Sequence, residues 1–278
     1  MTDFAYHRTY RGPIKLVILD WAGTTLDYGC YAPAVVFVEV FKRKGIEISM
    51  EQARAPMGLH KRDHIRVITR MSDVADAWKR KHGRHCTEDD VVDMFENHFK
   101  PLQLACIAQY ADLIPGTLDV VKHLRTRGVK IGSTTGYFGE AMDILKSEAA
   151  KRGYVPDSSV CATQVPAGRP HPWMVMQNMM NLEVSPPAAV VKVGDTLPDI
   201  EEGLNAGAWT IGLAKTGNEV GLNEEEIAKL SPQALEEKLA KARMRMRQTG
   251  AHYVVDAIAD VPAIVEEIER RLHAGDRP

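Results

Sequence analysis

The stretch IKLVILDWAGTT, residues 14–25, decides the fold of this chain. Its first part, residues 14–19, is a short apolar run of the kind that forms a buried strand. Asp20 follows this run directly, and Gly23 and two threonines come next. In parallel α/β sheets, ligands bind beyond the carboxyl ends of the strands. We therefore expect the Asp20 carboxylate to lie at the mouth of a binding site.

The rest of the chain alternates between strand and helix patterns. We predict further strands at 129–133, 159–162, 189–193, 208–212 and 252–255, and helices at 117–127, 138–152, 171–181, 198–206 and 231–248. Such alternation is typical of a parallel sheet covered by helices on both faces. The fold class is therefore α/β, with a Rossmann-like core.

The alternation is interrupted between Asp20 and residue 116, where only helical patterns occur. These patterns lie at 33–44, at 72–82 and in two pieces of 51–71 on either side of Pro56. A capping-box sequence at 87–90 indicates the start of a further helix. An inserted helical unit explains this pattern best. We predict a catalytic core formed by residues 1–30 and 102–278, and a helical cap formed by residues 31–101.

Composition excludes several classes of function. The chain has 278 residues and a net charge of −2, so its charge gives no reason to expect a nucleic acid or an acidic membrane as partner. It contains no apolar stretch near the roughly 20 residues that a membrane helix needs, and residues 1–13 do not resemble a signal peptide. Its four cysteines are scattered, without a Cys-x-x-Cys pair. We expect a cytoplasmic protein in a reducing compartment.

Four loops with polar side chains can form one site. They are DWAGTT at 20–25, GSTTGY at 132–137, GRPHP at 168–172 and VGDTLPD at 193–199. Hydroxyl and backbone N–H groups at a strand-to-helix turn suit phosphate oxygens, and an arginine can bind phosphate with two hydrogen bonds. Asp195 and Asp199 are oxygen ligands of the kind that Mg²⁺ prefers. Each loop alone is more often a turn or a helix cap, but all four together predict a phosphate and Mg²⁺ site.

The segment PMGLHKRDH, residues 56–64, lies in the predicted cap. In a helix, Lys61 and His64 are three residues apart and share a face. Burial and neighbouring cations would lower the pKa of a lysine here, and a neutral lysine can form a Schiff base with an aldehyde. Taken alone, this segment is better explained as a solvated basic helix face.

Taken together, these motifs resemble those of the haloacid dehalogenase superfamily and, within it, the phosphonoacetaldehyde hydrolase (phosphonatase) family. The resemblance rests on Asp-Trp-Ala-Gly-Thr, Met-Gly-x-x-Lys-x-x-His, Thr-Gly-Tyr and Gly-Arg-Pro, and it runs from about residue 14 to residue 222. It implies a superfamily core with a helical cap that carries a Schiff-base lysine. It also implies hydrolysis of phosphonoacetaldehyde to acetaldehyde and phosphate, and a homodimer formed through the cap.

The resemblance also implies a role for each matching residue. Asp20 is the nucleophile, Lys61 forms the imine, and His64 moves protons as the imine forms and resolves. The Mg²⁺ ligands are Asp20, the backbone carbonyl of Ala22, and Asp195, with Asp199 in support. The phosphoryl oxygens are held by Thr135, Gly136 and Arg169. The substrate pocket is lined by Met57, Cys30 and Tyr137.

One position departs from the common superfamily pattern. Most phosphatases of the superfamily read Asp-x-Asp, and the second Asp protonates the leaving group, but this chain has Ala22 there. Cleavage of a C–P bond through a lysine imine needs no such acid, because the electrons flow into the protonated imine. The absence of the acid therefore agrees with the interpretation of the chain as a phosphonatase.

Two alternatives remain open from the sequence. The chain could be another capped superfamily member, such as a phosphomonoesterase, a phosphomutase or a dehalogenase. Ala22 disfavours the first two, and a dehalogenase would leave the Asp195 and Asp199 pair without a purpose. The chain could also be a catalytically silent binding module. Retention of Asp20, Thr135 and Arg169 disfavours that interpretation.

Overall fold

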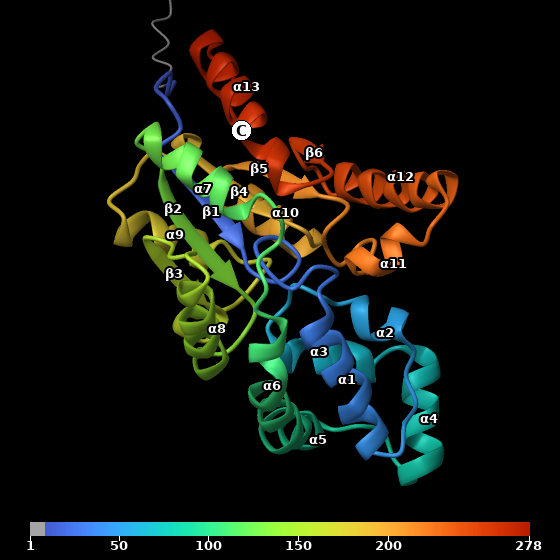
Figure 1. Cartoon of the computed structure of the whole chain (residues 1–278). Coiled ribbons are helices and arrows are strands. Elements are labelled where there is room, and N and C mark those ends of the chain that lie inside the picture. Colours follow the sequence, from blue (N-terminus) through green and yellow to red (C-terminus); the bar gives the residue numbers. More distant parts are fainter. Residues whose placement is uncertain (1–8) are drawn as a thin grey trace, which may run out of the picture.

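A computed structural model describes residues 9–278; residues 1–8 of the predicted core segment lie outside the described part. Its centre is one six-stranded parallel sheet in the order β3-β2-β1-β4-β5-β6 (Figure 1). The strands are Leu16–Asp20, Lys130–Thr135, Ser158–Cys161, Val190–Gly194, Trp209–Leu213 and Tyr253–Val255 for β1 to β6. The predicted α/β class and each predicted strand are confirmed.

Helices cover both faces of this sheet. They are α7 (Thr117–Thr126), α8 (Gly139–Lys151), α9 (Trp173–Asn181), α10 (Leu197–Asn205), α11 (Glu224–Ala228), α12 (Pro232–Gln248) and α13 (Val261–Ala274). Side chains of a strand alternate between the faces. Val17 and Leu19 therefore join the cluster with α7 and α13, and Leu16 and Ile18 pack with α9. All five residues of β1 are buried, because both faces are covered.

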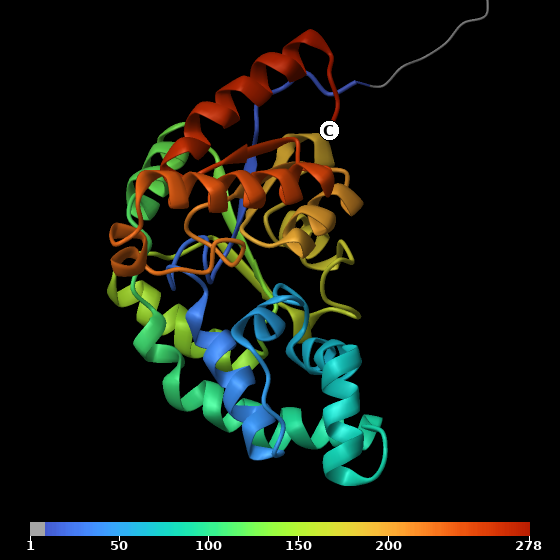
Figure 2. The ribbon, with the colours of Figure 1, turned by 90° about the vertical axis from the view of Figure 1, so that its right-hand side faces the viewer.

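The second group of helices lies beyond the carboxyl end of the sheet (Figures 1 and 2). It comprises α1 (Tyr31–Arg43), α2 (Met50–Arg54), α3 (Lys61–Thr69), α4 (Ser72–His82), α5 (Glu88–Asp93), a π-helical segment (Met94–Phe99) and α6 (Lys100–Cys106). The expected capping box opens α5, where Thr87 and Asp90 bond each other's backbone N–H groups. Helix α6 continues five residues beyond 101, where we placed the end of the cap. Within residues 9–278, no helix has the length and apolar character needed to cross a bilayer.

Two connections join these helices to the sheet, and they lie side by side. Leu26 forms a bridge with Leu113, and the amide of Asp27 donates to the carbonyl of Asp112 at 3.2 Å. The first connection is tightly turned, since Asp27, Gly29 and Cys30 have φ angles of 54°, 86° and 53°. The Asp27 carboxylate accepts hydrogen bonds from the first amides of α1, at 3.0 Å and 2.9 Å. This carboxylate thus fixes the direction in which the chain leaves the core.

Candidate active site

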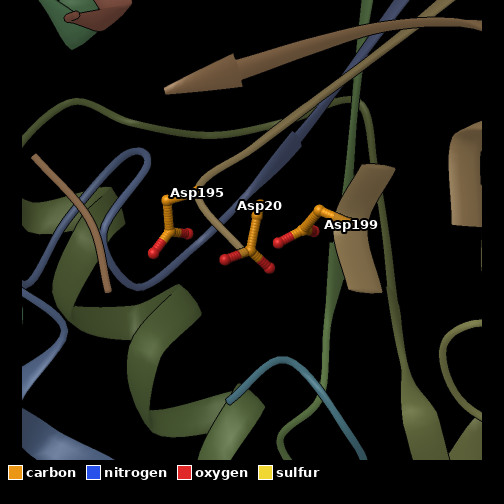
Figure 3. Close-up of side chains that lie close together, drawn as sticks. All are labelled: Asp20, Asp195 and Asp199. Carbon is orange, nitrogen blue, oxygen red and sulfur yellow. The ribbon is translucent and has the colours of Figure 1, made fainter. Parts of the chain in front are cut away.

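Three buried carboxylates meet where β1 and β4 end. Asp20 is the last residue of β1, Asp195 follows β4, and Asp199 lies in the first turn of α10. One ligand oxygen of each lies within 4.8 Å of the others. Figure 3 shows the three carboxylate groups side by side, with Asp20 between Asp195 and Asp199. The neighbouring positions of β1 and β4 in the sheet bring together groups that are about 175 residues apart.

Asp195 is held by two loops. Its Oδ1 accepts from the Thr24 hydroxyl at 3.1 Å, and its Oδ2 accepts from the Asn218 amide at 2.8 Å. Gly217 packs so closely that a Cβ there would lie 2.1 Å from the Asp195 Cβ. The loop after β5, which contains Gly217 and Asn218, therefore belongs to the site. This loop was not predicted to belong to the site, although Thr-Gly-Asn after a strand is a signal that could have indicated it.

Arg169 is buried beside these acids. Its Nη2 donates to Asp20 Oδ1 at 2.5 Å and lies 3.0 Å from Asp199 Oδ1. Its Nε donates to Glu202 Oε2 at 3.1 Å. On the other side, Lys192 donates to Asp199 Oδ1 at 2.5 Å. Glu202 and Lys192 were not predicted; a lysine inside the apolar run 190–194 was the available signal for a buried ion pair.

The charges of this cluster suit a divalent cation. Asp20, Asp195, Asp199 and Glu202 outnumber Arg169 and Lys192 by two charges when all are ionised, and all six are buried. Burial raises the pKa of Asp20, and it raises that of Asp195 with help from the nearby Asp20 and Asp199 charges. The pKa of Asp199 is lowered, because Arg169 and Lys192 outweigh its burial. A bound cation would relieve the repulsion between Asp20 and Asp195.

These oxygens fit Mg²⁺. Hard carboxylate oxygens are its usual protein ligands, and Mg²⁺ is typically bound by one or two carboxylates with substrate oxygens and water. Asp20 Oδ2 accepts no hydrogen bond from the described residues, so it is free to ligate. Both Asp199 oxygens are already bonded, to Lys192, Arg169 and Thr196. The arrangement therefore suits Asp20 and Asp195 as ligands, with Asp199 in support.

A small cavity of about 20 Å³ lies between this cluster and the cap. It is lined by Asp20, Ala22, Cys30, Pro33, Met57, Gly58, Lys61, Thr135, Gly136, Tyr137, Arg169 and Thr196. Every predicted site residue is in this set except His64 and the two acids on either side of Asp20, Asp195 and Asp199 (Figure 3). Because a water molecule needs about 10–15 Å³, the cavity holds little more than one water.

Lys61 enters the cavity from the first turn of α3. Its side chain is only 4% exposed. The Nζ atom lies 4.8 Å from the centroid of the Tyr137 ring and 3.9 Å from Met57 Sδ. Burial lowers the pKa of Lys61 to about 8. About a tenth of such lysines are neutral amines at pH 7, against fewer than one in a thousand at an unperturbed pKa of about 10.4.

His64 lies one turn further along α3, in the wall behind the cavity. Its ring stacks on Phe37 with the centroids 3.7 Å apart. Its Nε2 is 2.8 Å from the Ala53 carbonyl, which can only accept, so Nε2 carries the proton and Nδ1 is unprotonated. Burial and the Lys61 charge hold the pKa of His64 well below its usual value. His64 is therefore a neutral base, and its role as a proton shuttle stays a prediction.

Cys30 and Tyr137 are neutral groups of the cavity wall. Burial raises the pKa of the Cys30 thiol and that of the Tyr137 hydroxyl well above their ordinary values. The Tyr137 amide donates to Thr135 Oγ1 at 3.2 Å, which fixes the turn after β2. Neither side chain supplies a charge at neutral pH. Their contribution in this structure is shape and a low-polarity setting for Lys61.

The backbone of residues 58 and 59 packs closely against the core. Gly58 has φ +97°, and a Cβ there would lie 2.4 Å from Thr196 Oγ1. A Cβ on Gly136 would lie 2.7 Å from the Leu59 carbonyl oxygen. Only glycine permits this close contact at both positions. The segment before α3 is thus in direct contact with the loops after β2 and β4.

Comparison with known proteins gives a consistent result. The family model described as haloacid dehalogenase-like hydrolase matches residues 14–207. A Syntrophobacter fumaroxidans protein named phosphonoacetaldehyde hydrolase-like protein is 50% identical, with 100% of both chains covered. A phosphonoacetaldehyde hydrolase of Nitratidesulfovibrio vulgaris is 46% identical, covering 100% of this chain and 99% of the relative.

Solved structures agree with this result. A phosphonoacetaldehyde hydrolase-like protein from Oleispira antarctica superposes with a TM-score of 0.97 at 40% identity, over 99% of this chain and 100% of the other. A β-phosphoglucomutase from Clostridium difficile superposes with a TM-score of 0.65 at 16% identity, over 93% and 98% of the two chains. The second similarity concerns the fold alone.

Proposed function

Because the chain is a hydrolase that belongs to the phosphonoacetaldehyde hydrolase family of haloacid dehalogenase-like hydrolases, we propose that it cleaves the C–P bond of phosphonoacetaldehyde. The products are acetaldehyde and phosphate. One observation carries the proposal. The cavity brings a buried lysine with a pKa of about 8 and the carboxylate of Asp20 into the same small space. A phosphatase has no use for the lysine, whereas C–P cleavage of an aldehyde requires an electron acceptor.

The first step is imine formation at Lys61. The neutral Nζ attacks the aldehyde carbon, and loss of water leaves a C=N bond whose nitrogen takes up a proton. The Tyr137 ring face stabilises a cationic nitrogen at this position. His64 Nδ1, the unprotonated nitrogen next to Lys61 in α3, is the base that we propose for the proton transfers. The aldehyde end of the substrate is thereby tied to the cap.

The second step breaks the C–P bond. An Asp20 oxygen attacks phosphorus, the C–P electron pair moves into the protonated imine, and an enamine forms on Lys61. Asp20 then carries the phosphoryl group as an acyl phosphate. Arg169, Thr135 and the Gly136 backbone are placed to hold the phosphoryl oxygens. Since the carbon leaves as part of an enamine, no acid is needed at Ala22.

Two hydrolyses complete the cycle. Water attacks the acyl phosphate and releases phosphate and the free Asp20 carboxylate. The enamine gains a proton on carbon, and water then hydrolyses the imine to acetaldehyde and the Lys61 amine. One water is released and two are consumed, so the net reaction uses one water.

We propose Mg²⁺ as the cofactor, held by Asp20, Asp195 and the Ala22 carbonyl, with Asp199 in support. The bound ion supplies positive charge that stabilises the phosphoryl oxygens during transfer. The chain's own contribution is to hold the carboxylates of this site in place. Thr24 and Asn218 donate hydrogen bonds to Asp195, and Lys192 donates to Asp199.

We propose that residues 31–101 form the moving cap. Its opening admits substrate to a cavity that is otherwise too small, and its closure brings Lys61 to Asp20. A homodimer, which the family resemblance implies, and a cytoplasmic location are further proposals. Four free thiols agree with a reducing compartment. Light scattering of the purified protein tests the dimer.

The activity test compares two substrates and two variants. Phosphate release from phosphonoacetaldehyde in Mg²⁺ is measured for the wild type, Lys61→Arg and the exposed cap control Lys79→Arg. Arginine keeps the charge but cannot form the imine, so Lys61→Arg is expected to lose at least about 1,000-fold in kcat, whereas Lys79→Arg stays active. Near-normal turnover of Lys61→Arg, or equal wild-type activity on p-nitrophenyl phosphate, would contradict the proposal.

A further inference from the structure

The loop after β5 connects three parts of the molecule through one residue. The backbone amide of Asn218 donates to Asp195 Oδ2 at 2.8 Å. Its side chain faces the other way and bonds Arg54 twice: Oδ1 accepts from Nη1 at 3.3 Å, and Nδ2 donates to the Arg54 carbonyl at 3.2 Å. Asn218 is 8% exposed, so these bonds are shielded from water. One asparagine therefore contacts both a metal-site carboxylate and the cap.

Arg54 is the cap partner in this contact. It is the last residue of α2 and is 9% exposed. Its Nη1 also donates to the carbonyls of Gly29 at 2.7 Å and Cys30 at 3.2 Å, which lie in the first core-to-cap connection. The guanidinium carbon lies 5.0 Å from the centroid of the Tyr31 ring. Arg54 thus joins the hinge, the cap and the loop that carries Asn218.

The same loop is also tied to the loop of Asp20. Thr216 Oγ1 donates to the Gly23 carbonyl at 2.8 Å, and the Thr216 carbonyl accepts from the Gly29 amide at 2.8 Å. Gly217 packs against Asp195 with no room for a side chain. A displacement of this loop would therefore move the amide that holds Asp195 Oδ2.

We propose that Arg54 and Asn218 are positioning residues that couple cap closure to the geometry of Asp195, so that Mg²⁺ binds more tightly when the cap is closed. Opening the cap separates Arg54 from Asn218 and removes both side-chain bonds. The loop is then less restrained, and so is the Asn218 amide on Asp195. Because such coupling is reciprocal, Mg²⁺ must in turn favour the closed cap. The Mg²⁺ site would thus be fully formed only when the closed cap has also brought Lys61 close to Asp20.

The inference rests on the proposed Mg²⁺ site but not on the substrate. Its test is therefore Mg²⁺ binding by titration calorimetry, without substrate, to the wild type, Arg54→Met, Asn218→Ala and the double variant. Matched controls are Arg66→Met, a cap arginine bonded within the cap to Asp63 and Glu88, and Asn181→Ala, an exposed core asparagine. Hydrogen exchange of the cap segment 54–60, with and without Mg²⁺, provides the second measurement.

Each single variant is expected to bind Mg²⁺ roughly five- to tenfold more weakly, because Arg54→Met removes the Nη1 bond to Asn218 and Asn218→Ala removes both side-chain bonds to Arg54. The double variant should be no weaker than the poorer single variant, because both changes remove one contact. Mg²⁺ should slow exchange in segment 54–60 of the wild type, and less so in both single variants. The two control variants should behave as the wild type.

Three results would overturn the inference. Unchanged Mg²⁺ affinity in both single variants would show that the contact does not reach Asp195. If the losses of Mg²⁺ affinity in the two single variants add up in the double variant, the two residues act independently. A wild type that binds no Mg²⁺ would overturn both the inference and the proposed cofactor, whereas the first two results leave the cofactor intact. If Arg54→Met does not fold, Asn218→Ala, which retains the backbone amide, decides the matter.

Discussion

The Nζ atom of Lys61 lies 4.8 Å from the centroid of the Tyr137 ring, and this contact joins the cap to the core. Lys61 belongs to α3 of the cap, and Tyr137 follows β2 of the sheet. The ring covers the amine from one side and the Met57 thioether from another, so water is largely excluded. The lowered pKa of Lys61 therefore depends on burial that the core residue Tyr137 provides together with α3.

The pH dependence of turnover should report the Lys61 amine. Since its pKa is lowered to about 8, the neutral fraction grows about tenfold per pH unit below pH 8 and levels off above it. If imine formation limits kcat/KM, then kcat/KM should also rise about tenfold per pH unit between pH 6 and 7.5. A profile that is flat over this range would argue against Lys61 as the reacting amine.

Gly58→Ala should impair activity by keeping the cap from closing. The added Cβ meets Thr196 Oγ1 at 2.4 Å, and we expect kcat/KM to fall at least about tenfold. The matched control is Gly83→Ala, since Gly83 has a similar φ of +73° and nothing within 4 Å of the new Cβ. Both variants should lose about 1–2 kcal/mol of stability from left-handed backbone strain. Equal activities of the two variants would show that the contact with Thr196 is unimportant.

Asp27 should make the protein less stable as the pH rises. Burial raises its pKa to about 7, against 3.8 for the unperturbed group. Between these values the folded state binds more protons than the unfolded state, so the free energy of unfolding falls with increasing pH. Through Asp27, the free energy of unfolding should fall by up to about 3 kcal/mol between pH 5 and 7.

Asp27→Asn removes this titration and keeps one acceptor for the amides of α1. Denaturant unfolding at several pH values should show a flatter decline for this variant than for the wild type, and Asp119→Asn at an exposed position serves as the control. Parallel wild-type and Asp27→Asn curves would mean that Asp27 titrates in the folded protein as it does in the unfolded chain.

Arg169→Lys should reduce phosphoryl transfer without abolishing the fold. Arginine reaches Asp20, Asp199 and Glu202 at once with its planar donors, and a lysine ammonium cannot reproduce that geometry. We expect a loss of about 100-fold or more in kcat, measured as phosphate release. Wild-type kcat would show that the geometry of the guanidinium is dispensable.

The sequence was sufficient to predict the strands, because apolar runs between helix patterns depend mainly on local periodicity. Nine of the twelve cavity-lining residues were also predicted; Pro33, Gly58 and Thr196 were not named as site residues. The roles of those residues came from family resemblance and stay proposals. Helix ends were less certain; helix α9, for example, begins two residues later than expected, at Trp173.

The residues that sequence reasoning missed have partners on other elements of the fold. Lys192 in β4 bonds Asp199 in α10, and Glu202 in α10 bonds Arg169 in the loop before α9. Asn218 matters because of its bonds to Arg54, which is 164 residues away. The spacing of Lys61 and His64 predicted a shared helix face, but His64 stacks on Phe37 and only Lys61 lines the cavity. Periodicity contains no information about such packing.

The central claim is that Lys61 forms an imine with the substrate, and borohydride trapping tests it most directly. The protein is incubated with phosphonoacetaldehyde and Mg²⁺, sodium borohydride is added, and the modified peptide is mapped by mass spectrometry. The account predicts a reduced two-carbon adduct on Lys61 alone, with activity lost in proportion. An unmodified Lys61 in protein that still releases phosphate from phosphonoacetaldehyde would contradict it.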